Sequence, residues 1–566
     1  MVFVLVLVFL LSRNSSAQDF DILIKNGKIV DGSGKPGYVA DIAIKGDTII
    51  EIGNLQEKRA STVIWATDRV VSPGFIDLHT HCDRGLGKPA TTANVNYLTQ
   101  GVTTVVTGNC GSAPIKVRET AAAWEKTGIG TNAIFLAGLG TIRYKVIGVQ
   151  NRIASPLELE TMKSLLRQAL DEGAWGLSAA FQYIPDRFAS PEEIVELAGT
   201  AKASGGIFIS HQRSEEAQLA DAVRETIRIS RDSGIAADAT HLKASGKGNW
   251  GMMKEAVRLL EEARSRGVKV TADLYTYPEC VYSPLALVFN VPDDLNRFAE
   301  LLPLLDYFYI LKRLEDPLGI NRRRDSRPPD RGSWFESYTM TLAAALSDEI
   351  EKEQIKQLTL KGAPNKLNWA AMFGWDSFKI IKASKNKTRI GKTILDLAHE
   401  ENRDPFDVAV ELFLQEKNDL VISVFTMSET DIAWALKKDW MMVGSDAGAL
   451  TMKAGPDVHP GSYGTFPRLF RKYVREEGIL TVEEAVRKLS FLPARFLGLD
   501  DRGTLVKGAK ADIVIFDPNR IQEEENGFDA SHRRPGIDYV LINGRISLEK
   551  GVFNNSLNGR VLLHGR

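Results

Sequence analysis

The chain has 566 residues, 44% of them hydrophobic and 25% charged, so it exceeds one ordinary domain and has the composition of a globular protein with a large core. Its formal net charge of −1 provides no overall field that would attract nucleic acid or an anionic membrane surface. We therefore expect no nucleic acid as a partner of this protein.

The N-terminus carries a short apolar run, residues 2–11, which is followed by a polar stretch that ends in Ser15-Ser16-Ala17. The run is too short to span a bilayer, and small residues such as Ser15 and Ala17 are typical of a signal-peptide cleavage site. We predict a signal peptide over residues 1–17 and a periplasmic or extracellular protein, although the positively charged n-region is missing. An uncleaved N-terminal anchor is the alternative, and we expect no membrane insertion of the body.

Both ends of the chain are rich in short β segments and glycine turns, such as Asp31-Gly32-Ser33-Gly34 and Ile542-Asn543-Gly544-Arg545. These segments flank a centre with a different pattern. We predict one small β-sandwich domain built from both termini, residues 18–72 and 497–566.

The centre alternates apolar strand-like segments with amphipathic helical stretches. The predicted strands are residues 75–78, 102–107, 133–137, 174–178, 207–210, 236–240, 268–275 and 440–444. Eight β-α units predict an α/β fold with a TIM-type (β/α)8 barrel, over residues 73–291 and 365–496. The pattern breaks over residues 292–364, which include the basic run 321–329. We interpret this segment as an inserted surface excursion, since charge runs are usually solvated, with an active-site lid as the alternative.

Potential metal ligands follow five of the predicted strands. His79 and His81 share one face of the first strand, because side chains alternate with period two. The other residues at strand ends are Cys110, His211, His241 and Asp446. A single histidine at a strand end would be an ordinary core residue, but four with a thiol and a carboxylate favour a metal site. The cysteines Cys82, Cys110 and Cys280 are odd in number, so at least one thiol is free, buried or metal-bound.

These residues carry a resemblance to a known family. The chain resembles the amidohydrolase superfamily and, within it, the N-acyl-D-amino-acid deacylases (D-aminoacylases). The motifs most specific to that branch are Gly108-Asn109-Cys110-Gly111, His241-x-Lys243 and Gly464-Thr465-Phe466-Pro467-Arg468. The similar segments span nearly the whole chain apart from the predicted signal peptide and insertion.

The resemblance implies a zinc enzyme that hydrolyses the amide bond of N-acyl-D-amino acids, which are small-molecule substrates. One tightly held zinc would be bound by Cys110, His211 and His241, which leaves an open position for a water whose pKa falls to near 7. A second, weaker position would lie near His79, His81 and Asp446, with Cys110 able to bridge the two. Asp446 would act as the general base and acid, since it would take the proton of the attacking water and pass it to the departing amine.

The resemblance also implies groups that bind the substrate. Lys243 is similar to the lysine that binds the α-carboxylate in the family, and alternation places it on the same face as His241. Tyr183 and Tyr275 resemble the tyrosines that assist it, although Tyr277 competes for the role of Tyr275.

Two departures from the family pattern bear on specificity. Relatives usually carry histidine in a Gly-His-x-x-x-Arg loop where this chain has Leu139, and relatives commonly have His-Pro-Arg where this chain has Gly461 after His459-Pro460. This chain therefore lacks the arginine of that motif, whose guanidinium can bind a carboxylate through two hydrogen bonds. We accordingly expect substrates without an acidic side chain.

Three alternative functions share the fold. A cyclic-amide hydrolase normally needs a lysine at the end of the fourth strand for carbamylation, and residues 173–185 contain none. A dipeptidase that acts on dipeptides with a D-residue would use the same metal site and stays open. A non-catalytic scaffold would have lost ligands, whereas here every expected ligand is present.

Overall fold

The computed structural model describes residues 19–292, 295, 331–362, 368–524, 527–532 and 536–565. The predicted signal peptide, residues 1–17, and the basic run 321–329 lie outside these residues. Among the helices that the structure describes, none is both long and apolar enough to cross a bilayer.

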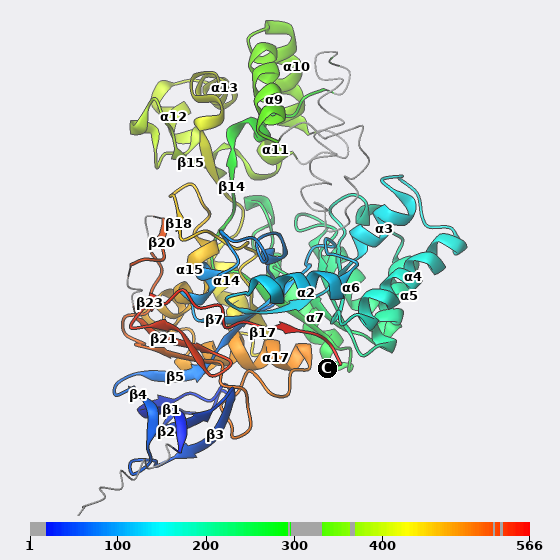
Figure 1. Cartoon of the computed structure of the whole chain (residues 1–566). Coiled ribbons are helices and arrows are strands. Elements are labelled where there is room, and N and C mark those ends of the chain that lie inside the picture. Colours follow the sequence, from blue (N-terminus) through cyan, green and yellow to red (C-terminus); the bar gives the residue numbers. More distant parts are fainter. Residues whose placement is uncertain are drawn as a thin grey trace, which may run out of the picture.

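A closed barrel of parallel strands forms the centre of the molecule (Figure 1). Neighbouring strands pair in chain order, and the first and last strands close the ring through a parallel bridge between Thr80 and Ala447. The strands correspond to all eight that the sequence predicts, so the predicted TIM-type barrel is confirmed. Their bounds are β6 (Phe75–Asp77), β7 (Val102–Thr107), β8 with its continuation β9 (Asn132–Phe135 and Ala137–Gly138), β10 (Gly176–Ala180), β11 (Ile207–His211), β12 (Ala236–Ala239), β13 (Val270–Leu274) and β17 (Met441–Val443).

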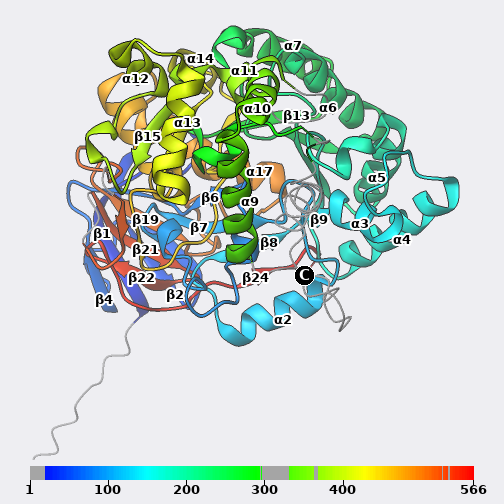
Figure 2. The same cartoon turned by 90° about the horizontal axis from the view of Figure 1, so that it is seen from above.

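The barrel strands are short and apolar because both of their faces are covered. All six residues of β7 are buried, for example, and α6 buries Leu219, Val223 and Ile229 at helical spacing against the strands. Ser155 and Glu158 form a capping box that starts α4. Figure 2 shows α4 to α7 along the outer edge of the barrel. The helices are α1 (Val95–Leu98), α2 (Val117–Thr127), α3 (Leu139–Ile147), α4 (Pro156–Asp171), α5 (Pro191–Ala203), α6 (Leu219–Ser233), α7 (Met253–Ser265), α14 (Glu429–Leu436), α15 (Gly461–Arg468), α16 (Val482–Val486) and α17 (Leu492–Leu497).

Strands from both termini form one nine-stranded sheet at one end of the molecule. The two halves meet where β19 runs antiparallel to β5, with Ile513 opposite Pro73. This arrangement confirms the predicted fold class, a barrel with a β domain made by both ends of the chain. The last strand, β24 (Val561–Leu562), is not part of that sheet and pairs with β8 of the barrel. The sheet contains β1 (Phe20–Ile29), β2 (Tyr38–Lys45), β3 (Thr48–Gly53), β4 (Ala60–Trp65), β5 (Val70–Pro73), β19 (Ile513–Phe516), β21 (Ile537–Ile542), β22 (Arg545–Glu549) and β23 (Val552–Phe553).

The inserted unit is larger than the predicted segment 292–364. It leaves the barrel after β13 and returns before α14, and it has its own three-stranded sheet and its own apolar core. Residues 378–425, which the sequence assigns to the barrel, belong to this unit. Their alternation of apolar strands and amphipathic helices is the same as that of a barrel unit, so periodicity alone could not separate them. The elements are β14 (Glu279–Pro284), α9 (Arg331–Leu346), α10 (Glu349–Lys361), α11 (Trp369–Phe373), β15 (Phe378–Lys382), α12 (Ile394–Glu401), α13 (Pro405–Glu416) and β16 (Val421–Phe425).

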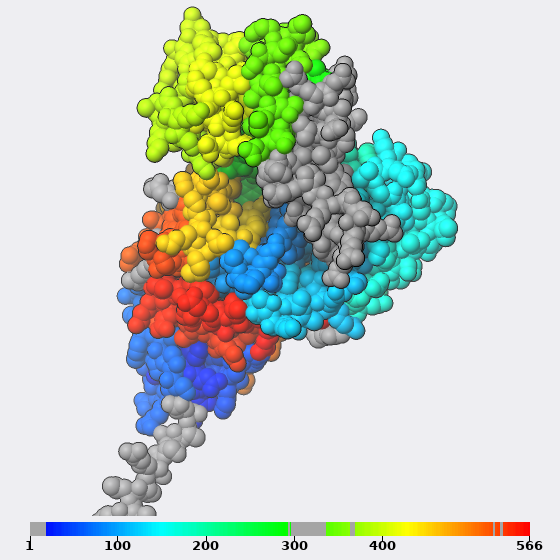
Figure 3. Space-filling model, turned by 45° about the horizontal axis from the view of Figure 1, so that its top comes forward, coloured from blue at the N-terminus to red at the C-terminus, as the bar shows by residue number. Residues whose placement is uncertain are grey.

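The inserted unit forms a separate lobe beyond the barrel (Figure 3). It is attached at the end of the barrel where β13 finishes, which is the end that carries the functional loops in this architecture. Lys247, in the loop after β12, forms an ion pair with Asp376 of the inserted unit, and the Trp250 indole donates to the Thr426 carbonyl at 2.9 Å. These contacts fix the inserted unit beside the mouth of the barrel.

Candidate metal centre

The barrel brings all six predicted metal ligands together at the carboxyl ends of its strands. Three overlapping groups each place their ligand atoms within 4.8 Å of one another: Cys110 with His211 and His241, Cys110 with His79 and His81, and Asp446 with His79 and His241. Cys110 therefore lies between two groups of ligands. The arrangement offers a compact site for one metal ion and room for a second position that shares the thiol.

The imidazoles are held for metal binding by partners on their second nitrogen. His211 Nε2 lies 2.9 Å from Gln182 Oε1, while its Nδ1 faces Cys110. His241 Nδ1 lies 2.9 Å from Glu215 Oε1. Metal-ligating histidines characteristically carry such outer partners, which fix the tautomer and the orientation of the ring.

The electrostatics of the cluster favour an ionised thiol and an ionised carboxylate. Burial raises the pKa of the Cys110 thiol, but the imidazoles of His79, His211 and His241 outweigh it and hold that pKa well below its usual value. Burial likewise opposes ionisation of Asp446, yet His79 and His81 hold its pKa well below the usual range. A thiolate with imidazoles is a donor set that suits zinc, so the residues present fit this metal.

Three of these residues have left-handed backbone conformations, with φ of 54° at Cys110, 38° at His241 and 52° at Asp446. Such conformations are costly for residues other than glycine and concentrate at functional sites. The neighbouring glycines are required by close packing, since a Cβ at Gly111 would lie 2.1 Å from the Asp186 carboxylate and one at Gly108 would lie 2.6 Å from a backbone carbonyl. The Gly108–Gly111 motif is therefore a tight turn that aims the thiol into the barrel mouth.

Lys243 lies beside the cluster but is engaged in a buried ion pair. Its ammonium donates to Glu215 Oε1 at 2.6 Å and to the His241 carbonyl at 3.0 Å, and it lies 2.9 Å from His241 Nδ1. Burial opposes the charge, but Glu215 raises the pKa of Lys243 above its usual value. Glu215 was missed as a functional residue by sequence analysis, although its place four residues after the predicted ligand His211 could have indicated it.

The three tyrosines have different surroundings. The Tyr183 ring lies 4.8 Å from the His211 ring, and the Lys243 ammonium lies 5.4 Å from the centre of the Tyr275 ring. The buried Tyr275 hydroxyl has no hydrogen-bond partner among the described residues, which leaves it available to a ligand. Tyr277 instead packs against His459 and beneath the Arg468 guanidinium. The Tyr277 hydroxyl also has no partner among the described residues, so it is the contact of the Tyr275 ring with Lys243, beside the metal ligands, that favours Tyr275 for the substrate-binding role.

The two residues that depart from the family pattern, Gly461 and Leu139, lie in different places. The backbone N–H of Gly461 donates to His459 Nδ1, and His459 Nε2 donates to the Glu279 carbonyl at 3.1 Å. Burial lowers the pKa of His459 to about 4, so it is neutral at pH 7. Leu139 is fully buried at the start of α3.

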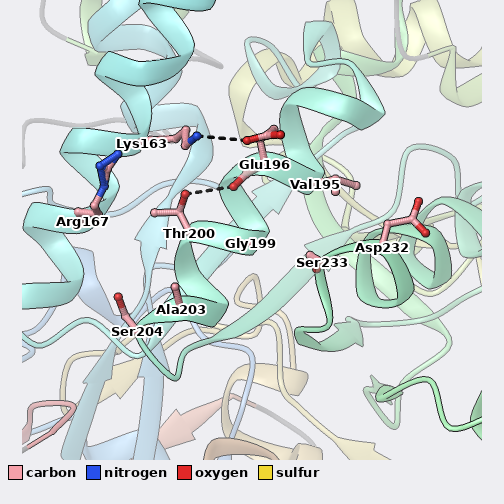
Figure 4. A pocket seen from close by; sticks show the side chains of 10 residues that line it. All are labelled: Lys163, Arg167, Val195, Glu196, Gly199, Thr200, Ala203, Ser204, Asp232 and Ser233. Atoms are coloured by element: carbon pink, nitrogen blue, oxygen red, sulfur yellow. Dashed lines mark hydrogen bonds and ion pairs between the residues drawn. The ribbon is translucent and has the colours of Figure 1, made fainter.

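A surface pocket of about 570 Å³ lies between α4, α5 and α6 (Figure 4). It is lined by helix residues such as Lys163, Glu196 and Thr200, and by Ser204 and Ser233, which come just before β11 and β12 begin. Because the metal ligands follow the ends of those strands, this pocket belongs to the opposite end of the barrel.

Comparisons with known proteins show what the whole chain is similar to. An amidohydrolase family model matches residues 406–548. The chain is 28% identical to a D-aminoacylase of Alcaligenes xylosoxydans xylosoxydans over 97% of this chain and 98% of that protein. It also matches a crystal structure of N-acyl-D-glutamate deacylase from Bordetella bronchiseptica with zinc and a phosphonate inhibitor, at 25% identity and a TM-score of 0.68 over 96% of this chain and 99% of that one.

A solved D-aminoacylase with a binuclear metal centre, described by one-metal activation and second-metal attenuation, is 27% identical, with a TM-score of 0.68 over 96% of this chain and 100% of that one. Over nearly its full length the chain is therefore similar to D-aminoacylases, which are amidohydrolases. The predicted resemblance is thereby confirmed, and the chain spans nearly the full length of these relatives.

Proposed function

We propose that this protein is a zinc-dependent hydrolase that cleaves the amide bond of N-acyl-D-amino acids and releases a carboxylic acid and a D-amino acid. The observation that carries the proposal is the convergence of Cys110, His211 and His241, with ligand atoms within 4.8 Å of one another at the barrel mouth. Relatives over nearly the full length are D-aminoacylases and N-acyl-D-glutamate deacylases, which supports the same activity.

Cys110, His211 and His241 would hold one tightly bound zinc, and His79, His81 and Asp446 would form a weaker position that shares Cys110. A three-ligand zinc site supplies Lewis acidity, which polarises a carbonyl and lowers the pKa of a water in its open position. A cysteine must lose its proton to bind a metal. Because the pKa of Cys110 is lowered, little free energy is needed for this deprotonation.

Asp446 would move the proton during the reaction. Its Oδ1 lies 3.2 Å from His81 Nε2 and 3.4 Å from His79 Nε2, so the carboxylate is held at the ligand cluster in its ionised form. An ionised carboxylate can accept a proton from the water that attacks the amide carbon and then give it to the departing amine nitrogen. Lys243 and the Tyr275 hydroxyl would orient the substrate through its α-carboxylate, with Tyr183 beside them.

The test is a substrate panel with zinc-loaded protein. We expect hydrolysis of N-acetyl-D-amino acids with neutral side chains, much slower hydrolysis of the L-enantiomers, and little turnover of L-D dipeptides or hydantoins. Turnover of dipeptides above that of every N-acyl-D-amino acid would replace the proposal with a dipeptidase. The prediction that the protein is exported rests on the sequence of residues 1–17 alone, and it stays a prediction.

A further inference from the structure

Two hydrogen bonds run in series beneath the metal ligands, from Asp273 through Thr240 to His79. The Thr240 hydroxyl donates to Asp273 Oδ2 at 2.7 Å, and the same oxygen lies 2.5 Å from His79 Nδ1. A hydroxyl has a single proton to donate. Because Thr240 gives that proton to Asp273, it can only accept from His79, so His79 carries a proton on Nδ1.

This proton on Nδ1 leaves the Nε2 atom of His79 as the one that faces the other ligands. Nε2 lies 3.5 Å from Cys110 Sγ and 3.4 Å from Asp446 Oδ1. A histidine binds a metal through a nitrogen that carries no proton. The Asp273–Thr240 pair therefore selects the tautomer in which His79 is able to bind.

The second oxygen of Asp273 acts on a different ligand. Asp273 Oδ1 accepts the backbone N–H of His241 at 2.9 Å, at the residue where φ is 38°. Asp273 and Thr240 have no exposed surface, so water does not compete for these bonds. One buried carboxylate thus holds the left-handed turn at His241 and, through Thr240, the imidazole of His79.

We propose that Asp273 is a positioning residue of the metal centre, which acts through Thr240 to set the tautomer of His79 and directly on the backbone of His241. The inference rests on the proposed function, because it requires His79 to be a metal ligand. Outer partners of ligating histidines contribute roughly 10- to 100-fold to metal affinity. We expect the Thr240 hydroxyl to contribute in this range at the weaker position, where His79 would bind.

The first experiment measures zinc uptake against buffered free zinc for wild type, Thr240→Val and Thr240→Ser. Thr240→Val keeps the shape of the side chain but removes the hydroxyl, so the weaker position should lose about 10- to 100-fold in affinity while the first zinc is retained. Thr240→Ser should restore wild-type uptake. Thr107→Val is the matched control, because the equally buried Thr107 hydroxyl donates to the Ile134 carbonyl at 2.8 Å instead of meeting an imidazole.

The second experiment reads the tautomer of His79 by 15N NMR of zinc-loaded protein labelled at histidine, with the signal assigned through a His79→Asn variant. Asp273→Asn should reverse the donor and acceptor roles in the two hydrogen bonds that link residue 273, Thr240 and His79. The amide oxygen must face the His241 N–H, so the amide N–H faces Thr240, whose hydroxyl then donates to His79 Nδ1. We expect the proton of His79 to move from Nδ1 in the wild type to Nε2 in this variant, with loss of the weaker metal position.

The outcomes separate this inference from the proposed function. Unchanged affinity at the weaker position in Thr240→Val, or a wild-type His79 protonated on Nε2, would overturn the positioning role. A wild type that takes up a single zinc at every concentration would also overturn it, since His79 would then bind no metal. Wild-type protein that binds both zinc ions as expected but hydrolyses no N-acyl-D-amino acid would overturn the proposed function and leave the positioning role intact.

Discussion

Replacement of Lys243 by methionine should destabilise the protein as well as weaken substrate binding, because Lys243 and Glu215 form a buried ion pair. Lys243 is 4% exposed and Glu215 is 7% exposed, and their charged atoms lie 2.6 Å apart. At an effective dielectric constant of about 20, Coulomb's law gives roughly 6 kcal/mol of attraction at this distance. Removal of one partner from a buried pair typically costs about 3–5 kcal/mol, since the other charge stays buried without its counter-ion.

The double variant Lys243→Met with Glu215→Gln removes both charges and should recover most of that loss, to within about 1–2 kcal/mol of wild type. Urea unfolding of wild type, both single variants and the double variant at one fixed zinc concentration measures the coupling as a double-mutant cycle. A double variant as unstable as Lys243→Met would show that the two charges are not coupled and would refute this argument.

The substrate role of Lys243 can then be measured by comparing the double variant with Glu215→Gln, because Glu215 also holds the metal ligand His241 and its replacement is common to both variants. Loss of a charge-assisted hydrogen bond to the α-carboxylate should lower kcat/KM by about 2–3 kcal/mol for an N-acetyl-D-amino acid. The corresponding carboxamide has no carboxylate and should lose much less. Equal losses on both substrates would mean that Lys243 only supports the fold.

Three further predictions follow from the site. Cys110→Ala should lose most of the tightly bound zinc in metal analysis, because two imidazoles alone make a poor site; full occupancy would exclude Cys110 as a ligand. Asp446→Asn should keep the tightly bound zinc while turnover falls about 100-fold or more, the usual contribution of a positioned general base; near-normal turnover would contradict that role. The pKa of His459 is lowered to about 4 in the folded protein, whereas a histidine in the unfolded chain has a pKa of about 6.5. As pH falls below about 6.5, the unfolded chain is protonated at this residue before the folded protein, which lowers the free energy of unfolding. Between pH 7 and pH 4.5, wild type should lose about 2 kcal/mol more unfolding free energy than His459→Gln, allowing for the partial exposure of the ring; equal losses in urea unfolding would refute this linkage.

The sequence was sufficient to predict the barrel and the cluster at its mouth because both depend on local patterns. Each barrel strand is a short apolar run, and the polar residue that follows it, such as His211 or Asp446, must lie at the strand end. In a closed parallel barrel all these ends meet at one face, so ligands far apart in the chain converge without any knowledge of the loops.

The outer partners of the ligands could not be predicted in the same way. Asp273 lies inside a strand that reads as a buried apolar run, and its contact with Thr240 depends on the register between β12 and β13. Glu215 lies in a loop, and its contact with Lys243 depends on how the loop after β11 folds back. The extent of the inserted unit was also missed, because β15 and β16 have the same local pattern as barrel strands and differ only in the strands with which they pair.

The left-handed residues show how the barrel helps to fix the turns that carry the metal ligands. Cys110, His241 and Asp446 each lie in the turn just after a barrel strand and have positive φ, a conformation that costs on the order of 1 kcal/mol or more for a residue with a side chain. At two of these positions the turn is held by a hydrogen bond to the barrel itself: the His241 N–H donates to the Asp273 carboxylate at 2.9 Å, and the Asp446 N–H donates to the His79 carbonyl at 3.0 Å. These two ligands are thus oriented by hydrogen bonds to residues of neighbouring barrel strands. A metal centre built in this way is pre-organised before the ion binds, which is the condition for a constant geometry during catalysis.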